Sequence, residues 1–598
     1  MHILGVSCFY HDAAAALVKD GELVCSAEEE RFSRKKHDYS FPRQAISFCL
    51  DFAGIKNSGL DYVVFHEKPF RKFERILKTS ISTYPAGSLV FAEAIKNWFS
   101  EKLWIKEILR DHLSIPEDKI LFLEHHLSHA ASSFYCSPFP EAAILTIDGV
   151  GEWATGTLGI GRDNKITILK QQRFPHSLGL LYSAFTSFLG FEINEGEYKV
   201  MGMAPYGTPR FADKILEHLI HIYPDGSFAL DMKYFAFSYS MRQSYSKKFE
   251  QLFGRPRELG KDFFTAQSGF PLYFGDKPSD FEKQCAENQY YADIAASIQK
   301  VTEEILLRQA CFLYETTRVK KICLAGGVVL NSVANGRLLR EGPFDELFIH
   351  PAPGDSGAAT GAALYVHHAL CKPQKRFTLE NAYWGKEYSN EEIRRFLEDN
   401  KINFTCCDNP HELVNTTVET IISGKVVGWF QGRFELGPRA LGNRSILADP
   451  RNANMKDIVN LKIKFRETFR PFAPVILEEE LENFFETKGN KAQYPLRFML
   501  FVLPLKANKR AHIPAVDHCG TGRVQTIRED WNPLYYQLVK TFGEKTGVPI
   551  LLNTSFNLKG EPIVNSPENA YNTFRQSGLD RLVMGNFIID KERDEKNT

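Results

Sequence analysis

The alternation of apolar and polar positions at the start of the chain predicts three short strands joined by tight turns. Residues 3–7 (ILGVS), 13–18 (AAAALV) and 22–30 (ELVCSAEEE) are apolar or alternating stretches, and the segments between them are turn-forming. The pattern returns at residues 143–171, where AILTI, WATGTLGI and KITILKQ follow one another with polar turns between them. Two such meanders, each opening on a polar or acidic turn, predict a duplicated core.

Helical periodicity follows the meanders. Residues 292–317 carry apolar side chains at helical spacing. Residues 320–340 predict a buried strand, a Gly-Gly turn and a helix, and residues 347–370 predict a strand, a loop and a helix of small residues. This order is typical of the actin, sugar-kinase and chaperone ATPase superfamily, in which each first turn faces a nucleotide phosphate.

Two stretches interrupt this regular pattern. Residues 208–285 are rich in Phe, Tyr, Pro and charge with weak periodicity, and we interpret them as an insertion. A linker-like segment lies at about 371–393, and the pattern of helices and strands changes after it. Strands are predicted there at 425–430 and 547–556. The sequence therefore predicts two domains, residues 1–375 and residues 376–598.

Composition narrows the class of protein. A chain of 598 residues is too long for one ordinary core, and its 73 basic and 73 acidic residues give no net charge that would favour nucleic acid or an anionic membrane. No apolar run reaches the length of about 18 residues that a membrane span needs. The N-terminus lacks a signal peptide's basic region, and the eleven cysteines include no C-x-x-C. We expect a reduced cytoplasmic protein that binds neither nucleic acid nor membrane.

The stretch EHHLSHAASSF (Glu124–Phe134) places three histidines within five residues. On a helix, His125 and His129 share a face one turn apart, as two ligands of one metal would, but His126 and His129 could also share a face. Histidines on a helix surface or hydrogen-bonded in a core explain the same spacing. Asp148, at a strand end, and Asp355, where a helix begins, could complete a metal site or serve as turn and cap residues.

Two glycine-rich turns are candidates for nucleotide binding. DGVGEWA superficially fits a dinucleotide fingerprint, but the strand-like segment after it argues against a Rossmann site, and no Walker A sequence is present. LAGGVVLN places Gly326 and Gly327 before a helix N-terminus, where N–H groups could face an anion. A tight turn would need these glycines for steric reasons as well.

Arginines are concentrated in the predicted second domain. Residues 431–451 contain Arg433, Arg439, Arg444 and Arg451 among glycines, and residues 461–475 add Lys462, Lys464, Arg466 and Arg470. Arg523 and the polar strand end with Asn553, Ser555 and Asn557 come later. Arginine beside glycine-rich loops is typical of phosphate recognition, although a solvated helix explains residues 461–475 equally well. The pattern predicts a site for a phosphorylated small molecule.

Taken together and in order, ten motifs resemble the O-carbamoyltransferases of the NodU/TobZ/CmcH type. The resemblance runs from about residue 3 to about residue 580. Its motifs are GVSCFYHDAAAAL, AEEERFSRKKH, EHHLSHAASSF, IDGVGEWATG, GEYKVMGMAPYG, AGGVVLN, GDSGAATGAAL, GRFELGPRALGNRSILADPR, FRETFRPFAP and LLNTSFNLKGEP. The only departure is Tyr198–Lys199, where the family more often has Gly-Lys.

The resemblance implies an α/β fold with a TsaD-like, actin-like ATPase domain followed by a YrdC-like domain. It also implies the reaction, a one-carbon group transfer by a carbamoyltransferase. In the family, the YrdC-like domain forms carbamoyl adenylate from carbamoyl phosphate and ATP, and the TsaD-like domain transfers the carbamoyl group to a hydroxyl of a small molecule. A homodimer would be ordinary. Alternatives are a threonylcarbamoyl-type tRNA-modifying enzyme and a nucleotide-gated binding protein without transfer chemistry.

The resemblance also implies roles for single residues. His125, His129, Asp148 and Asp355 match the metal ligands, with iron(II) the usual metal and Zn, Mn or Mg also compatible with such ligands. His11 matches the general base and Lys36 a lysine of the transfer site. The nucleotide contacts would be Gly149, Gly326, Gly327 and Asn331. The pocket for carbamoyl phosphate and ATP would be formed by Arg439, Lys464, Arg470, Arg523 and Ser555.

Overall fold

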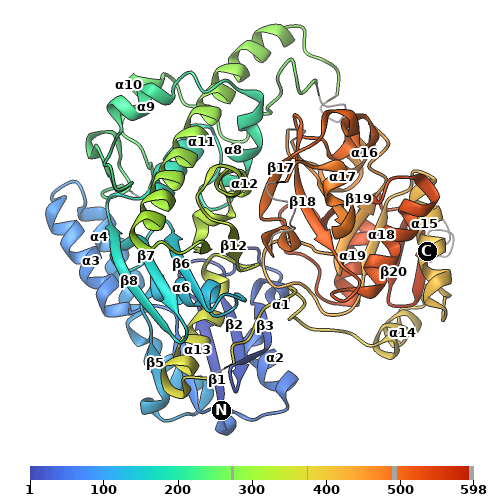
Figure 1. Ribbon diagram of the computed structural model, residues 1–598, viewed down its shortest axis with the longest axis horizontal. Helices are drawn as coiled ribbons and strands as arrows, with labels where there is room; N and C mark the ends of the chain where they lie inside the picture. Colours follow the sequence, from blue (N-terminus) through green and yellow to red (C-terminus); the bar gives the residue numbers. More distant parts are fainter. Residues whose placement is uncertain are drawn as a thin grey trace. The chain divides into compact units, whose positions relative to one another are not determined.

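The computed structural model describes the chain except residues 101, 241, 271–274, 374, 468, 488–493 and 592–598 (Figure 1). It divides into two compact units. Unit 1 contains residues 1–29, 39–265 and 283–379, and unit 2 contains residues 30–38, 266–282 and 380–598. A short segment near the N-terminus therefore belongs to the unit built by the C-terminal third of the chain.

The first sheet of unit 1 forms from the opening meander. Its strands are β1 (His2–Ser7), β2 (Ala14–Lys19), β3 (Glu22–Glu28), β4 (Tyr62–Phe65) and β5 (Ile120–Phe122), in the order β3-β2-β1-β4-β5. The meander strands pair antiparallel, while β4 and β5 continue the sheet in parallel. Both faces are covered, which explains why β1 and β2 read as continuous apolar runs.

The second sheet repeats the first in order and direction. Its strands are β6 (Glu141–Ile147), β7 (Ala154–Arg162), β8 (Lys165–Arg173), β11 (Lys321–Ala325) and β12 (Glu346–Ile349), in the order β12-β11-β6-β7-β8. Again three antiparallel strands are extended by two parallel ones. This duplicated topology is that of the actin-like ATPases, so the predicted fold class of the N-terminal part is confirmed.

Two helices of small residues join the halves of unit 1. α6 (His125–Phe134) packs against α13 (Asp355–Cys371), and α13 also packs on β1. A Cβ on Gly361 would lie 2.0 Å from the Ser128 carbonyl oxygen, and a Cβ on Gly5 would lie 1.9 Å from that of Ala359. Because only glycine permits this approach, the small residues of both segments place the starts of α6 and α13 near each other.

The other helices of unit 1 surround this core. They are α2 (Arg43–Ala53), α3 (Pro69–Ser82), α4 (Ser88–Ser100), α5 (Ile105–Leu113), α7 (Leu178–Phe188), α8 (Glu197–Met203), α11 (Phe281–Thr317) and α12 (Ser332–Glu341). None of the helices in the described part of the chain is both long and apolar enough to cross a membrane.

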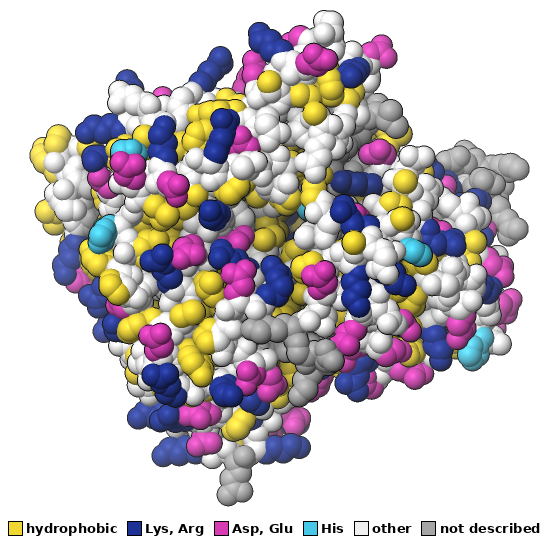
Figure 2. Space-filling model, turned by 45° about the horizontal axis from the view of Figure 1, so that its top comes forward, with side chains coloured by type: hydrophobic (Ala, Val, Ile, Leu, Met, Phe, Trp, Pro, Cys, Tyr) yellow, Lys and Arg dark blue, Asp and Glu magenta, His cyan; other side chains and the backbone are white. Residues whose placement is uncertain are grey.

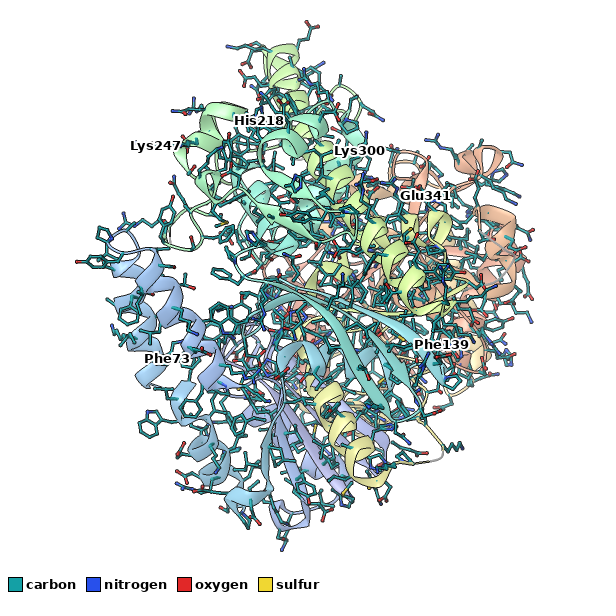
Figure 3. The ribbon with its side chains drawn as sticks, turned by 60° about the vertical axis from the view of Figure 1, so that its left-hand side comes forward. Phe73, Phe139, His218, Lys247, Lys300 and Glu341 are labelled. Atoms are coloured by element: carbon teal, nitrogen blue, oxygen red, sulfur yellow. The ribbon has the colours of Figure 1, made fainter. Side chains whose placement is uncertain are left out.

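The region predicted as an insertion has structure of its own. It contains α9 (Ala212–His218), α10 (Lys247–Phe253) and the hairpin of β9 (Ile220–Ile222) and β10 (Phe228–Leu230). In Figure 3, His218 on α9 and Lys247 on α10 lie at the same end of the unit as Lys300 on α11, apart from Phe73 on α3. Phe249 and Phe253 pack against Phe185 and Phe188 of α7, which accounts for the aromatic composition.

Unit 2 is built on a mixed sheet with the order β13-β21-β20-β14-β15-β19-β16-β18-β17. The strands are β13 (Thr405–Cys406), β14 (Val427–Phe430), β15 (Arg444–Ala448), β16 (Ala473–Leu477), β17 (Phe501–Pro504), β18 (Thr521–Ile527), β19 (Ile550–Ser555), β20 (Arg581–Met584) and β21 (Phe587–Asp590). The helices are α1 (Glu30–Ser33), α14 (Asn390–Asp399), α15 (Pro410–Ile422), α16 (Met455–Val459), α17 (Leu481–Phe484), α18 (Pro533–Thr546) and α19 (Pro567–Gln576).

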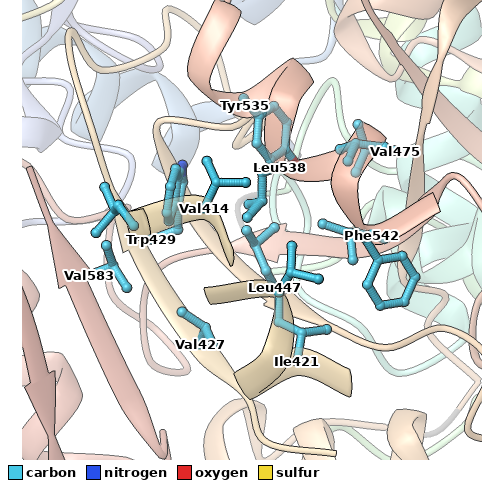
Figure 4. Close-up of a cluster of buried hydrophobic side chains, with 14 of the residues drawn as sticks. Val414, Ile421, Val427, Trp429, Leu447, Val475, Tyr535, Leu538, Phe542 and Val583 are labelled. Carbon is cyan, nitrogen blue, oxygen red and sulfur yellow. The ribbon is translucent and has the colours of Figure 1, made fainter. Parts of the chain in front are cut away.

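The core of unit 2 lies between the sheet and the helices α15 and α18. Trp429 and Leu447 from the sheet meet Ile421 of α15 and Phe542 of α18 in one buried cluster (Figure 4). Burying such large side chains is the main stabilising contribution of this unit. On the face drawn in Figure 2, Lys and Arg side chains are interspersed with Asp and Glu, in keeping with the balanced composition.

Candidate functional site

The two outer histidines of the α6 motif point their imidazoles at one another. His125 Nε2 and His129 Nε2 are 3.1 Å apart, and both lie close to one oxygen of Asp148, at 3.0 and 3.1 Å. Asp148 is the residue after β6, and Asp355 is the first residue of α13. One oxygen of Asp355 lies 3.6 Å from His125 Nε2 and 3.4 Å from His129 Nε2. The β6–β7 turn and the start of α13 therefore deliver two carboxylates to the histidine pair.

The electrostatics of this cluster favour positive charge. Burial would lower the pKa of His129, but hydrogen bonds with Asp148 and Asp355 raise it to about 9. Burial would raise the pKa of Asp148, but hydrogen bonds with His125 and His129 hold it well below its usual range. The carboxylates are thus anionic in an enclosed site, where a cation is strongly stabilised.

The donor set fits a divalent cation. The four ligand atoms all lie within 4.8 Å of one another. Ligands at the usual 2.0–2.2 Å from a metal are separated by about 3.0–3.5 Å, close to the 3.0–3.6 Å between the imidazole nitrogens and carboxylate oxygens here. In addition, Oδ2 of Asp355 is buried without a hydrogen-bond partner. His125, His129, Asp148 and Asp355 could therefore hold a metal, and nitrogen and oxygen ligands suit Fe, Zn or Mn.

The middle histidine of the motif has a different environment. His126 Nδ1 lies 2.7 Å from Thr146 Oγ1, and its Nε2 lies 2.9 Å from the Ala154 carbonyl oxygen. Burial, reinforced by the neighbouring histidines, lowers its pKa to about 3. A neutral imidazole with both nitrogens engaged ties α6 to the β6–β7 hairpin.

Two buried carboxylates near the cluster were not singled out by the sequence. Glu152 accepts hydrogen bonds from the backbone N–H groups of His125 at 3.0 Å and Lys68 at 2.8 Å. Glu67 forms a buried ion pair with Lys72 at 2.6 Å, and its carboxylate lies 3.9 Å from His125 Nδ1. The position of Glu152, four residues after Asp148 in DGVGE, was the available signal for the first of these.

His11 lies in the β1–β2 turn of unit 1. Its Nδ1 is 2.7 Å from the Asp12 carboxylate, and the turn places Asp12 at a φ of 36°. Burial would lower the His11 pKa, but the hydrogen bond and charge of Asp12, together with Asp355 and Asp148, raise it to about 9. The turn thus holds an imidazole within the field of the acidic cluster. Lys36 belongs to unit 2, in the segment 30–38, where it is half-buried.

The predicted nucleotide turns meet at Asp148. Its second oxygen accepts hydrogen bonds from the N–H groups of Gly149 at 2.7 Å and Gly327 at 3.3 Å. Gly326 has a φ of 99°, and a Cβ there would lie 2.2 Å from the Ile147 carbonyl oxygen. The steric need for this glycine is therefore real. Asn331 caps α12 by accepting from the Ala334 N–H and also bonds Gln299.

Three arginines of the glycine-rich segment in unit 2 have structural partners. Arg433 donates to the Trp384 and Gly385 carbonyls, Arg444 is fully buried and donates to the Gln431 carbonyl, and Arg451 pairs with Asp449. Backbone carbonyls and one aspartate therefore engage these three guanidinium groups.

A cationic cluster remains in unit 2. Burial, followed by the charges of Arg439, Arg466 and Arg470, holds the pKa of Arg523 well below its usual range. Burial and the same Arg466 and Arg470 do so for Lys464. Arg470 pairs with Glu467 at 3.5 Å, and Arg466 donates to Asn460 Oδ1 at 3.2 Å. The concentration of positive charge nevertheless favours an anion, as in a polyphosphate site.

The loop after β19 completes this cluster. The Lys464 ammonium donates to the Asn557 side chain at 2.8 Å and to the Asn557 carbonyl at 3.0 Å, with Ser555 Oγ at 3.3 Å. All five residues expected to line the carbamoyl phosphate and ATP pocket (Arg439, Lys464, Arg470, Arg523 and Ser555) thus connect to one cluster. Arg466 and Asn557 are further members.

Comparison with known proteins adds relatives over the whole chain. The chain is 44% identical to uncharacterized protein sll1178 of Synechocystis sp. over 100% of this chain and 98% of that protein. It is 36% identical to nodulation protein NolNO of Sinorhizobium fredii, over 98% and 79% respectively. Nodulation protein U of Rhizobium tropici is 27% identical over 94% and 91%.

Solved structures align with part of the chain. HypF of T. kodakarensis has 15% identity and a TM-score of 0.32, covering 62% of this chain and 48% of that one. The ROK hexokinase of Thermus thermophilus has 13% identity and a TM-score of 0.29, covering 61% and 97%. The fold assignment rests on the sheet topology of unit 1.

Two family models match the two parts of the chain. The model described as carbamoyltransferase N-terminus matches residues 2–364, and the model described as carbamoyltransferase C-terminus matches residues 418–591. The first alone covers more than half of the 598 residues. The chain therefore belongs to the carbamoyltransferase family and is a carbamoyltransferase.

Proposed function

We propose that the protein is an ATP-dependent O-carbamoyltransferase acting on a small hydroxylated molecule. The observation that carries the proposal is the cationic cluster of unit 2, formed by Arg439, Lys464, Arg466, Arg470 and Arg523. It suits substrates that bring several negative charges, such as carbamoyl phosphate and ATP. The acidic metal-compatible cluster of unit 1 suits a second, separate step.

The first step would take place in the C-terminal unit, predicted as residues 376–598. Water cleaves carbamoyl phosphate to carbamate and phosphate. An oxygen of the carbamate then attacks the α-phosphorus of ATP, the bond to the β-phosphate oxygen breaks, and pyrophosphate leaves. Arg439 and Arg523 would bind the phosphates and offset the charge that develops at phosphorus. Carbamate is short-lived in water, so this step needs a pocket that excludes solvent.

The second step would take place in the N-terminal unit. The acceptor hydroxyl oxygen attacks the carbamoyl carbon, the bond to the adenylate oxygen breaks, and AMP leaves. Neutral His11 would accept the hydroxyl proton. Gly149, Gly326, Gly327 and Asn331 would face the nucleotide, and Lys36 the carbamoyl group. A divalent cation held by His125, His129, Asp148 and Asp355 would supply Lewis-acid stabilisation of phosphate oxygens, with Fe(II) the metal that the family resemblance suggests.

The insertion offers a candidate surface for part of the acceptor. A cavity of about 370 Å³ in unit 1 is lined by the α7–α8 loop, including Phe191 and Glu192, and by Tyr245 and Arg257 of the insertion. Its size and mixture of aromatic and charged side chains suit a small organic molecule. We therefore place acceptor recognition in the insertion.

The decisive experiment measures pyrophosphate release by the whole protein. We expect release when ATP and carbamoyl phosphate are both present, and none when either is omitted. Fe(II), Zn(II) and Mn(II) should be supplied in parallel, so that a missing metal cannot account for a negative result. Absence of pyrophosphate under all of these conditions would contradict the proposal.

A further inference from the structure

The segment Glu30–Asp38 crosses from one compact unit to the other along the chain. It follows β3 and precedes α2, which both belong to unit 1, yet it packs within unit 2. We call these nine residues the strap. The strap carries four cationic side chains, Arg31, Arg34, Lys35 and Lys36. Its position raises the question of what these side chains do in unit 2.

Arg31 is held against the loop that carries Arg439. Its side chain is 1% exposed, and its guanidinium donates to the carbonyl oxygens of Gly437 at 2.6 Å and Glu435 at 3.3 Å. The guanidinium also lies over the Phe434 ring, 5.5 Å from its centre. A buried guanidinium that donates to two backbone carbonyls fixes the path of the loop.

The same loop is closed from its other side. The buried Glu435 carboxylate accepts hydrogen bonds from the N–H groups of Leu441 at 2.8 Å, Asn443 at 2.8 Å and Arg444 at 3.1 Å. Residues 436–443 therefore form a tight loop with Arg439 near its middle. Arg31 contacts its first limb, two residues before Arg439.

Arg34 contacts the loop after β19, which is the second loop of the cationic cluster. Its guanidinium donates to the carbonyl oxygens of Ile563 at 2.7 Å and Pro562 at 2.8 Å. This loop, residues 556–564, is closed by a hydrogen bond from the Val564 N–H to the Phe556 carbonyl at 2.9 Å. It contains Asn557, whose side chain accepts a hydrogen bond from the Lys464 ammonium.

We propose that Arg31 and Arg34 are positioning residues that hold the two phosphate-binding loops of unit 2 in the geometry that binds ATP and carbamoyl phosphate. Arg31 donates from one guanidinium nitrogen to two backbone carbonyls of the first loop, and Arg34 donates from two nitrogens to two carbonyls of the second. Arg31 lies on α1, and Arg34 directly follows this helix. The identity of the phosphate ligands depends on the proposed function, whereas the contacts by which the two arginines hold the loops do not.

Hydrogen exchange of the full-length protein without ligand tests whether the two arginines hold the loops in place. In Arg31→Met, we expect backbone amides of residues 436–444 to exchange at least tenfold faster, with residues 556–564 unchanged. In Arg34→Met, we expect the reverse. Lys35→Met is the matched control, because Lys35 is an exposed strap residue of the same charge, and it should change neither loop. Unchanged exchange in both arginine variants would overturn the proposal.

Ligand binding then tests the positioning role. By calorimetry with ATP, and separately with inorganic pyrophosphate, we expect at least tenfold weaker binding in Arg31→Met and Arg34→Met and less than twofold change in Lys35→Met. Arg34→Lys, which keeps the charge but loses the two-nitrogen fork, should recover only part of the affinity. Faster exchange without weaker binding would reduce both arginines to structural residues and overturn the proposal.

Turnover separates this inference from the proposed function. If the wild type releases pyrophosphate, the arginine variants should show a raised KM for carbamoyl phosphate with kcat changed less than threefold. If the wild type releases none, the proposed function fails while the exchange and binding results still decide the role of the strap. Should Arg31→Met not fold, Arg34→Met carries the same test, since its side chain is only partly buried.

Discussion

The Glu152 carboxylate accepts the backbone N–H of His125, the first residue of α6, at 3.0 Å. Glu152 lies on the same turn as Asp148, four residues further along, and also accepts the Lys68 N–H. One buried carboxylate therefore ties the start of the histidine helix to the turn that carries an aspartate of the cluster. This hydrogen bond fixes the distance between His125 and Asp148 better than α6 alone could.

Replacing Glu152 should weaken metal binding without removing any ligand. Outer groups that orient metal ligands typically contribute about 10–100-fold to affinity, and we expect Glu152→Ala to lose about that much. Glu152→Gln keeps one acceptor oxygen and should lose less. Affinity can be measured at equilibrium by competition with a chromophoric chelator. Glu141→Gln, at an exposed carboxylate on β6, is the control, and equal losses in both variants would contradict the role of Glu152.

The three histidines of α6 should separate into two ligands and one structural residue. His129→Ala removes an imidazole from the cluster, so its metal affinity should fall by more than the about 100-fold expected of outer groups. His126→Gln should keep the metal but lower the melting temperature, because losing buried hydrogen bonds costs about 1–3 kcal/mol. Metal content after gel filtration, with calorimetric melting, tests both. Metal loss in His126→Gln alone would reverse the assignment.

The fold of unit 1 could be predicted because its signals are local. Each meander is three consecutive strands, so alternation and turn residues within about thirty positions are enough to recognise it. Membership of the strap in unit 2 could not be predicted in this way. Arg31 reaches carbonyls of Glu435 and Gly437, some 400 residues later, and backbone carbonyls leave no signature in a sequence.

Prediction of the candidate sites depended on the type of contact. Asp148 follows a strand end and Asp355 begins a helix, so motif order predicted both near the histidines. The density of arginines is a weaker guide to a site, because a guanidinium donates equally well to phosphate and to backbone carbonyls. Arg444 is fully buried and donates to the Gln431 backbone carbonyl. Only this burial distinguishes it from Arg439.

This distinction can be tested with a matched pair of arginines. Arg439→Ala should lower kcat/KM for pyrophosphate release by about 100-fold or more, as expected when a group that stabilises developing charge is lost. Arg451→Ala removes the same charge from the same segment, but its partner is Asp449. It should therefore change kcat/KM less than about threefold, since partly exposed ion pairs contribute little. Similar losses in the two variants would mean that the total positive charge of residues 431–451, and not the cationic cluster, binds the substrates.

Replacing His11 should abolish carbamoyl transfer without affecting adenylate formation. His11→Ala should still release pyrophosphate at the wild-type rate, because the proposed adenylate-forming groups all lie in unit 2, but should form no carbamoylated acceptor. The two products can be followed in one reaction by phosphate-coupled absorbance and mass spectrometry. Normal transfer by His11→Ala would remove it as the base.

The pH dependence of transfer gives a sharper test, because Asp12 raises the His11 pKa despite the opposing effect of burial. A base acts when neutral, so the transfer rate should rise about tenfold per pH unit below the His11 pKa and level off above it. Pyrophosphate release should not follow this curve. Asp12→Asn removes the charge that favours the imidazolium, so its pKa falls and the profile should move to lower pH. Asp20→Asn, at an exposed carboxylate that pairs with the N-terminus, should leave the profile in place. A profile that Asp12→Asn does not move would assign the titration to another group.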